Sequence, residues 1–139
     1  DNLRHGLSAD LGFSADARAE NIRRTGEVAR ILHDAGAVVL TALISPFRAD
    51  RDRVRARLPR GAFFEVHVAT PIEECERRDP KGLYARARAG EIADFTGIGS
   101  PYEAPRDPEL RVADAGQSVD ASVEAIVGML EDRRIIRRL

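Results

Sequence analysis

The feature that most constrains the fold is an alternation between helical periodicity and short, continuous apolar runs. Residues 15–36 carry apolar side chains at helical spacing and end at Gly36, a residue typical of a helix C-terminus. The run AVVLTALI follows directly at residues 37–44, and its β-branched content is typical of a strand buried on both faces of a parallel sheet. Strands that alternate with helices form βαβ units, so the sequence predicts an α/β domain with a parallel sheet.

The alternation continues to the end of the chain. Further strands are predicted at residues 63–70 (FFEVHVAT) and 109–113 (ELRVA). The other predicted helices cover residues 49–58, 71–78, 82–95 and 118–136, and a loop rich in Gly and Pro covers residues 96–108. A parallel sheet needs helices on both faces and protection of its edge strands, and three strands are few for such a sheet. We therefore expect the sheet to be incomplete. A single domain is expected over residues 1–139, with a helical segment at 114–139.

Composition restricts the class of protein. The hydrophobic fraction of 43% and the formal net charge of −1 predict one soluble globular domain without the basic field that nucleic-acid binding needs. No apolar run approaches the roughly 18 residues of a membrane span, and the first residues lack a secretory signal, so we expect a cytoplasmic location. Cys75 is the only cysteine, and His5, His33 and His67 have no ligand-like spacing. Neither an intramolecular disulfide nor a metal site is therefore expected.

Four motifs in a fixed order carry a resemblance to a known family. They are DNLRHGL…DLGFS…RAENIRR, LISPFRADRDRVR, RDPKGLYARARAGEIADFTGI and SPYEAP…PEL. Together they resemble the adenylylsulfate kinase (APS kinase) family from residue 1 to about residue 113. The resemblance implies a three-layer α/β/α fold of the P-loop kinases. It also implies transfer of the γ-phosphoryl group of ATP, with Mg²⁺, to the 3′-hydroxyl of adenylyl sulfate, which gives the activated sulfate donor PAPS.

One part of the family pattern does not occur in the sequence. In family members, a strand, a Walker A loop, a helix and a second strand precede the motif DNLRHG. The pattern G-x-x-x-x-G-K-[ST] is absent from residues 1–139, and Lys81, the only lysine, is followed by Gly and Leu. In the family, that loop and its lysine hold the phosphates of ATP. We therefore expect residues 1–139 to contain the adenylyl sulfate site and a lid, but not the unit that binds the phosphates of ATP.

The resemblance also implies roles for particular residues. Phosphoryl transfer needs positioned reactants and neutralised charge. Asp1 is implied to accept the proton of the 3′-hydroxyl or to contact hydrated Mg²⁺. Ser45 is the second catalytic candidate, and a substrate contact is favoured over a covalent phosphoserine. The implied contacts to adenylyl sulfate are Asn2, Arg4, Phe13, Arg18, Asn21, Ile44, Ser45, Lys81 and Phe95.

These assignments agree with the chemistry of the side chains. Arg4 is suited to bidentate contacts with phosphate or sulfate oxygens. Phe13 and Phe95 are implied to sandwich the adenine ring, because stacking makes no hydrogen-bond demands. Residues 76–95 resemble a mobile lid that brings positive charge over the phosphates, with Arg78 and Lys81 as the phosphate contacts. The other cations of the lid are Arg77, Arg86 and Arg88.

Two positions depart from the family pattern. Ala17 stands before Arg18 where the family usually has Asp, which weakens the expected local network. His67 is a polar residue in a strand expected to be central, which indicates an edge strand or a rearranged sheet.

Alternative interpretations stay open at this point. Arg4 is also compatible with a solvated surface position, and Phe13 and Phe95 with plugs of a core beneath a loop. For the chain as a whole, two alternatives to the kinase are a non-catalytic module that binds adenylyl sulfate or PAPS and a fragment without a stable fold of its own. Family members are often homodimers, and fusion to or association with an ATP sulfurylase is a further option.

Overall fold

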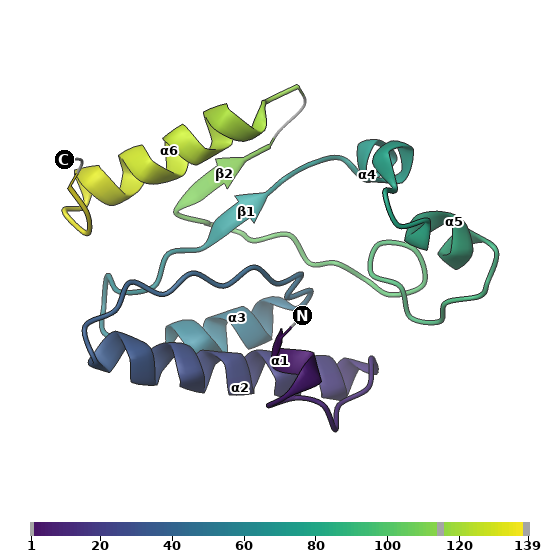
Figure 1. The fold of residues 1–139 in the computed structure, drawn as a ribbon, viewed down its shortest axis with the longest axis horizontal. Helices are drawn as coiled ribbons and strands as arrows, with labels where there is room; N and C mark the ends of the chain where they lie inside the picture. The colour runs from purple at the N-terminus through teal and green to yellow at the C-terminus, as the bar shows by residue number, and fades with distance from the viewer. Residues whose placement is uncertain (1, 114–115, 138–139) are drawn as a thin grey trace. The chain divides into compact units, whose positions relative to one another are not determined.

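The computed structural model describes residues 2–113 and 116–137 of the chain, which divide into two compact units (Figure 1). The first unit comprises Asp1–Phe63 and Ser100–Glu103, and the second comprises Phe64–Gly99 and Ala104–Leu139. The catalytic candidate Asp1 lies outside the described residues. No helix in the described part of the chain is long and apolar enough to cross a membrane.

The first unit is built on a long helix, α2 (Ala15–Asp34), which confirms the helix predicted at residues 15–36. Its N-terminus is capped by Ser14, whose hydroxyl accepts a hydrogen bond of 3.2 Å from the backbone N–H of Ala17. Its C-terminus closes at Gly36, whose φ of +89° suits a residue without a side chain. The short helix α1 (Asn2–His5) precedes α2 and lies within the motif DNLRHG.

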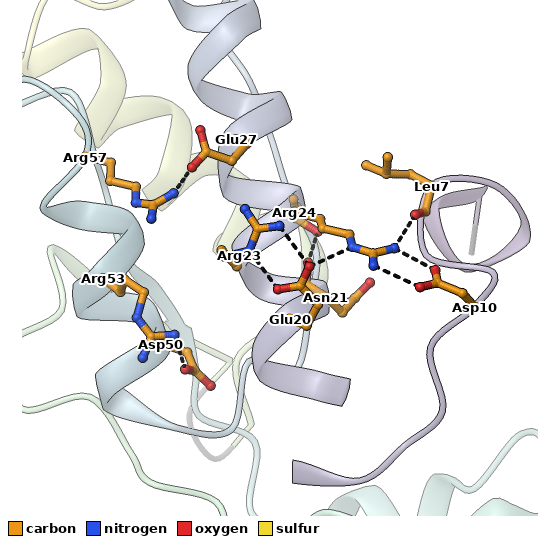
Figure 2. A network of polar contacts seen from close by, with 11 residues as sticks. Leu7, Asp10, Glu20, Asn21, Arg23, Arg24, Glu27, Asp50, Arg53 and Arg57 are labelled. Carbon is orange, nitrogen blue, oxygen red and sulfur yellow. Dashed lines mark hydrogen bonds and ion pairs between the residues drawn. The ribbon is translucent and has the colours of Figure 1, made fainter. Parts of the chain in front are cut away.

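The second element of the first unit, α3 (Arg48–Arg55), packs against α2 and confirms the helix predicted at residues 49–58. Gly26 of α2 is buried at this contact, and a Cβ atom there would lie 2.7 Å from Cγ2 of Val54. The absence of a side chain at Gly26 therefore permits the close approach of the two helices. An ion pair between Arg57 and Glu27 also joins the segment after α3 to α2 (Figure 2).

The strand predicted at residues 37–44 is wrong. This segment follows α2 as an irregular chain, and it has no ladder partner among residues 2–113 and 116–137. Val38, Leu40 and Ile44 are 51%, 80% and 67% exposed. The apolar pattern of the segment is that of a buried strand, but a strand exists only when a neighbouring strand takes up its N–H and C=O groups.

The second unit contains the parallel sheet, which has two described strands instead of the three predicted. Strands β1 (Val66–Val68) and β2 (Leu110–Val112) pair in parallel, with His67 opposite Arg111. They confirm the strands predicted at 63–70 and 109–113 in shorter form. Helix α6 (Val119–Asp132) lies along β2 (Figure 1), and Val112 is the most deeply buried apolar residue at 2% exposure. Because both described strands are edges, a polar residue such as His67 is tolerated.

Two short helices, α4 (Ile72–Arg78) and α5 (Leu83–Arg88), lie in or next to residues 76–95, the segment that the resemblance predicts to be a lid. Helix α5 is shorter than the predicted helix at 82–95. The chain leaves the helix at Gly90, where φ is +77° and the N–H donates to the carbonyl oxygen of Ala87. A glycine in the left-handed region ends a helix, and this ending was not predicted from the charged sequence around it.

Candidate functional site

The N-terminal motif forms a braced loop in the first unit. Nη1 of Arg4 donates to the carbonyl oxygens of Leu11 and Gly12, at 3.2 and 2.9 Å. The guanidinium of Arg4 also lies over the ring of Phe13, 4.4 Å from its centre. From the first turn of α2, Nε of Arg18 donates to the carbonyl oxygen of Phe13 at 2.7 Å. The structure thus brings Arg4, Phe13 and Arg18 together, and their role in binding adenylyl sulfate stays a prediction.

Phe13 presents an open aromatic surface. Its side chain is exposed, at 64%, although Arg4 covers one face of the ring. A guanidinium on one face leaves the other face available for a flat ligand. The alternative interpretation of Phe13 as a core plug is therefore wrong.

Asn21 of α2 is a buried polar residue with unused hydrogen-bonding capacity. It is 4% exposed, and its Oδ1 has no hydrogen-bond partner among the described residues. Its backbone carbonyl, by contrast, accepts a hydrogen bond of 2.8 Å from the hydroxyl of Thr25. A buried acceptor without a donor costs free energy, so this amide suits a donor supplied by a ligand or by water. Asn2 is exposed on α1.

A second arginine of α2, Arg24, connects the helix to the same loop (Figure 2). Its Nη1 donates to the carbonyl oxygen of Leu7 at 2.7 Å, and its two terminal nitrogens hold the carboxylate of Asp10 at 2.6 and 2.9 Å. Its Nε donates to Oε1 of Glu20 at 2.9 Å. Hydrogen bonds from Arg23 and then Arg24 lower the pKa of Glu20 to about 2. The hydrogen bond from Arg24 likewise lowers the pKa of Asp10.

Ser45 adopts a backbone conformation that is uncommon for a residue with a side chain. Its φ is +45°, and its carbonyl oxygen accepts a hydrogen bond of 2.6 Å from Nη1 of the buried Arg51. Nη2 of Arg51 reaches the carbonyl oxygen of Glu103 at 2.7 Å, and the N–H of Glu103 donates to Pro46 at 2.8 Å. Such strain persists where the surroundings hold it in place, which is typical of functional sites. The neighbouring Ile44 is exposed.

In the second unit, the arginines of the predicted lid make ion pairs with glutamates of the lid or of α4. Arg77 and Arg78 both donate to the carboxylate of Glu74, which lowers the pKa of Glu74 to about 2. Arg86 pairs with Glu91, and Arg88 pairs with Glu76. Lys81 is exposed in the turn between α4 and α5, and it has no ion pair within the described residues. Of the predicted lid cations, Lys81 is therefore the most available to a ligand.

Asp79 fixes the start of α5 beside Lys81. Its carboxylate accepts hydrogen bonds from the backbone N–H groups of Tyr84 and Ala85, at 3.2 and 3.0 Å. Burial opposes ionisation of Asp79, but these backbone hydrogen bonds prevail and lower its pKa. The ring of Tyr84 contacts Phe95 edge to face, with 5.0 Å between the ring centres. Phe95 lies in the second unit and Phe13 in the first, so the adenine sandwich stays a prediction.

The described residues contain no cluster of candidate metal ligands. No group of three or more His, Cys, Asp or Glu side chains in residues 2–113 and 116–137 is arranged to hold one. Cys75 instead donates its thiol to the carbonyl oxygen of Thr70 at 3.9 Å.

Comparison with known proteins identifies the family. The model of the family described as adenylylsulphate kinase matches residues 1–113. The chain belongs to this family. An "Adenylyl-sulfate kinase" of Marinobacter nauticus is 54% identical over 137 residues, which are 99% of this chain and 69% of the relative. The "Bifunctional enzyme NodQ" of Azospirillum brasilense is 57% identical over 97% of this chain, but the match covers only 22% of that protein.

A solved structure of an adenylylsulphate kinase agrees with the fold. The Mycobacterium tuberculosis APS kinase CysC, in complex with AMPPNP and APS, is 52% identical and superposes with a TM-score of 0.85. The match covers 94% of this chain and 76% of that chain. The predicted class, the α/β fold of the P-loop kinases, is confirmed.

The adenylylsulphate kinase motifs also contain residues whose importance we did not predict. Arg24 and Asp10 join α2 to the loop, and Arg51 and Glu103 hold Ser45. The spacing of Glu20 and Arg24 on a helix is a signal for their ion pair. No signal in a single sequence indicates that Arg24 also reaches Asp10, or that the charged helix at 49–58 buries Arg51.

Proposed function

We propose that the protein carrying this chain is an adenylyl-sulfate kinase that transfers the γ-phosphoryl group of ATP to the 3′-hydroxyl of adenylyl sulfate, giving PAPS and ADP. The observation that carries the proposal is the family match over residues 1–113, with relatives of that name more than half identical to the chain. In the reaction, the bond from O3′ to Pγ forms and the bond from Pγ to the oxygen of the leaving ADP breaks. Asp1 is the proposed acceptor of the hydroxyl proton.

The proposed acceptor site lies on the braced loop and on α2. Adenine stacks on the open face of Phe13, and Phe95 is the second stacking residue that the family resemblance implies. Arg4, Arg18 and Asn2 contribute polar contacts around the nucleotide, and the unpartnered amide oxygen of Asn21 accepts a hydrogen bond from the ligand. Ile44 and Ser45 are further proposed substrate contacts, and a hydrogen bond from Arg51 to the carbonyl oxygen of Ser45 holds their turn.

The proposed lid supplies positive charge to the phosphates. Lys81 is the main contact, because it is exposed and makes no ion pair within the described residues. Arg78 is the second candidate, and to contribute it has to share its guanidinium with Glu74. This arrangement supports charge neutralisation as the role of the lid in a loose transition state.

ATP and Mg²⁺ complete the proposed reaction. The AMPPNP in the Mycobacterium tuberculosis complex supports ATP as the donor. Mg²⁺ is proposed from the general chemistry of phosphoryl transfer, to which it would supply positive charge near the donor phosphates. Residues 1–139 contain no G-x-x-x-x-G-K-[ST] motif, so the Walker A loop that binds the phosphates of ATP is not among these residues.

The partners and location are proposed at the same level. The "Bifunctional enzyme NodQ" is much longer than the matched region, which supports fusion to a second activity such as an ATP sulfurylase as one arrangement. A homodimer and a cytoplasmic location stay predictions from the family and from the composition.

The test is ADP release in the presence of ATP, Mg²⁺ and adenylyl sulfate, with calorimetric titration of adenylyl sulfate alongside. We expect ADP and PAPS to form only when both substrates are present. The second candidate function is a non-catalytic module that binds adenylyl sulfate or PAPS. Saturable binding without turnover would support that module, and neither binding nor turnover would contradict both functions.

The role of Lys81 can be tested separately. Lys81→Ala removes the exposed cation and should raise the KM for the substrates about tenfold, whereas Lys81→Arg keeps the charge and should retain most of the affinity. Arg106→Ala, an exposed position elsewhere in the second unit, is the control and should behave as wild type. Equal kinetics of Lys81→Ala and Arg106→Ala would remove Lys81 from the site.

A further inference from the structure

Within the described part of the chain, residues 6–11 of the loop between α1 and α2 make no backbone hydrogen bond to α2. The backbone hydrogen bonds of residues 6–11 run among themselves and back to Leu3. Side chains make the connections to α2 instead. Arg18 holds the carbonyl oxygen of Phe13 at one end of the loop, and Arg24 holds Leu7 and Asp10 at the other. Guanidinium groups of α2 therefore contribute to the position of this loop, in addition to the burial of Ser8.

We propose that Arg24 is a positioning residue for adenylyl sulfate: by fixing residues 7–10 on α2, it sets where Phe13 and Arg4 stand relative to Asn21. The proposal rests on the proposed function, because the platform matters only if a nucleotide binds there. Arg24 itself is not placed against the ligand. It acts through the loop, whose far end Arg4 braces at Leu11 and Gly12.

The geometry of Arg24 shows why an arginine serves this purpose. Each of its three side-chain nitrogens donates, and its contacts point in different directions (Figure 2). Nη1 and Nη2 make a bidentate contact with Asp10, Nη1 also serves the carbonyl oxygen of Leu7, and Nε is directed at Glu20. A lysine has a single side-chain nitrogen and no planar guanidinium. It therefore cannot make a bidentate contact with Asp10 and at the same time donate to the carbonyl oxygen of Leu7 and to Glu20.

The surroundings keep this guanidinium in place. The side chain of Arg24 is only 24% exposed, whereas that of Asp10 is 61% exposed. Arg23 grips the same carboxylate of Glu20 at 2.7 and 2.8 Å, which orients Glu20 toward Arg24. Glu20 immediately precedes Asn21, so the network that holds the loop is adjacent to the buried amide of the site. A displaced loop would therefore change the distance between the aromatic platform and this amide.

The experiment compares Arg24→Lys and Arg24→Ala with Arg30→Ala in the protein that carries this chain. Arg30 is a matched control, because it lies on the same helix and pairs only within it, with Glu27 and Asp34. The KM values for adenylyl sulfate and for ATP, kcat and the melting temperature are measured for each variant. Misplacement of a binding group by a distant change is costly, so we expect the KM for adenylyl sulfate to rise roughly tenfold in both Arg24 variants. The KM for ATP should stay constant, and Arg30→Ala should match wild type.

Other outcomes overturn the proposal. If a folded Arg24→Ala variant keeps its KM for adenylyl sulfate, or if both KM values rise equally, Arg24 has only a general structural role. If the Arg24 variants do not fold, Asp10→Asn removes one contact and keeps the helix. Its KM for adenylyl sulfate is then expected to rise, and an unchanged value is the contrary result.

The failure of this inference is distinguishable from the failure of the proposed function. If wild type turns over, the KM comparison decides the role of Arg24. If wild type binds adenylyl sulfate in the calorimeter without turnover, the dissociation constants of the same variants decide it. If wild type does neither, the proposed function has failed, and the inference about Arg24 is overturned with it.

Discussion

Two helices of this molecule carry the same charge pattern, Glu-x-x-Arg-Arg, and use it differently. It occurs at residues 20–24 of α2 in the first unit and at residues 74–78 of α4 in the second. In both helices the glutamate accepts hydrogen bonds from both arginines, which lowers its pKa to about 2. Arg24 continues to Leu7 and Asp10, however, whereas the hydrogen bond of Arg78 stays within α4.

The difference teaches that a local motif does not determine how far its charges reach. The spacing of the pattern is sufficient to predict ion pairs along one face of a helix. Arg24 has its role because the loop before α2 folds back over the helix and covers the Arg24 side chain, which is only 24% exposed. The side chain of Arg78 has no such cover within the described residues and is 59% exposed. In the first unit the pattern connects distant segments, and in the second it organises a single short helix.

The aromatic residues give the largest expected contrast between the two units. Phe13→Ala should weaken binding of adenylyl sulfate by about 1–3 kcal/mol, the scale of one lost base stack, without lowering the melting temperature, because the ring is 64% exposed. Phe95→Ala should lower the melting temperature as well as the affinity, because its ring packs against Tyr84. Calorimetric titration and thermal melts of the two variants measure these effects.

The control for this pair is Tyr84→Phe, which keeps the aromatic contact with Phe95 and should preserve affinity. An unchanged affinity in both Phe variants would remove the sandwich. A loss of stability in Phe13→Ala equal to that in Phe95→Ala would break the comparison, because it would show that the Phe13 ring is part of a core.

A smaller contrast is expected from two glycines inside helices. Gly26 of α2 faces α3, and an added methyl group would lie 2.7 Å from the stiff side chain of Val54. Overpacking there costs typically 1–3 kcal/mol and the better helix propensity of Ala returns about 1, so Gly26→Ala should lower the free energy of unfolding by about 1 kcal/mol. Gly128 of α6 has no neighbour within 4 Å of such a methyl group, so Gly128→Ala should raise it by up to about 1 kcal/mol.

Urea unfolding of the two variants measures this contrast in sign. Equal free energies of unfolding for Gly26→Ala and Gly128→Ala would mean that the contact between α2 and α3 is loose. Close packing at a helix glycine would then not distinguish the first unit from the second. The double variant Gly26→Ala with Val54→Ala serves as the matched control, because removal of both methyl groups of Val54 should relieve the overpacking.

The two units also show how much was predictable from the sequence. Helix α2 and its end at Gly36 follow from apolar spacing and from one glycine, because both signals are local. The segment at 37–44 was wrongly predicted, since its apolar content does not reveal whether a neighbouring strand pairs with it. The shared assignment of Arg4 and Phe13 came from the family motif, and their contact agrees with it. The connection from Arg24 to Asp10 joins positions separated in sequence, which no local pattern encodes.

The smallest expected contrast concerns acid pH, where the two glutamates should titrate alike but act differently. Each has a folded-state pKa of about 2 instead of the usual 4.5, so its stabilising effect is present above pH 4.5 and is lost as the pH falls toward 2. Glu20→Gln and Glu74→Gln should each remove part of this dependence, by a small amount because the groups are solvent-screened. Carboxyl chemical shifts in an NMR pH series give both pKa values. Protonation of Glu20 should also shift the amide signals of residues 7–10, because its partner Arg24 holds that distant loop, whereas protonation of Glu74 should not. The substitution Glu20→Gln should likewise shift these signals. An equal shift at residues 7–10 in Glu74→Gln would contradict the comparison.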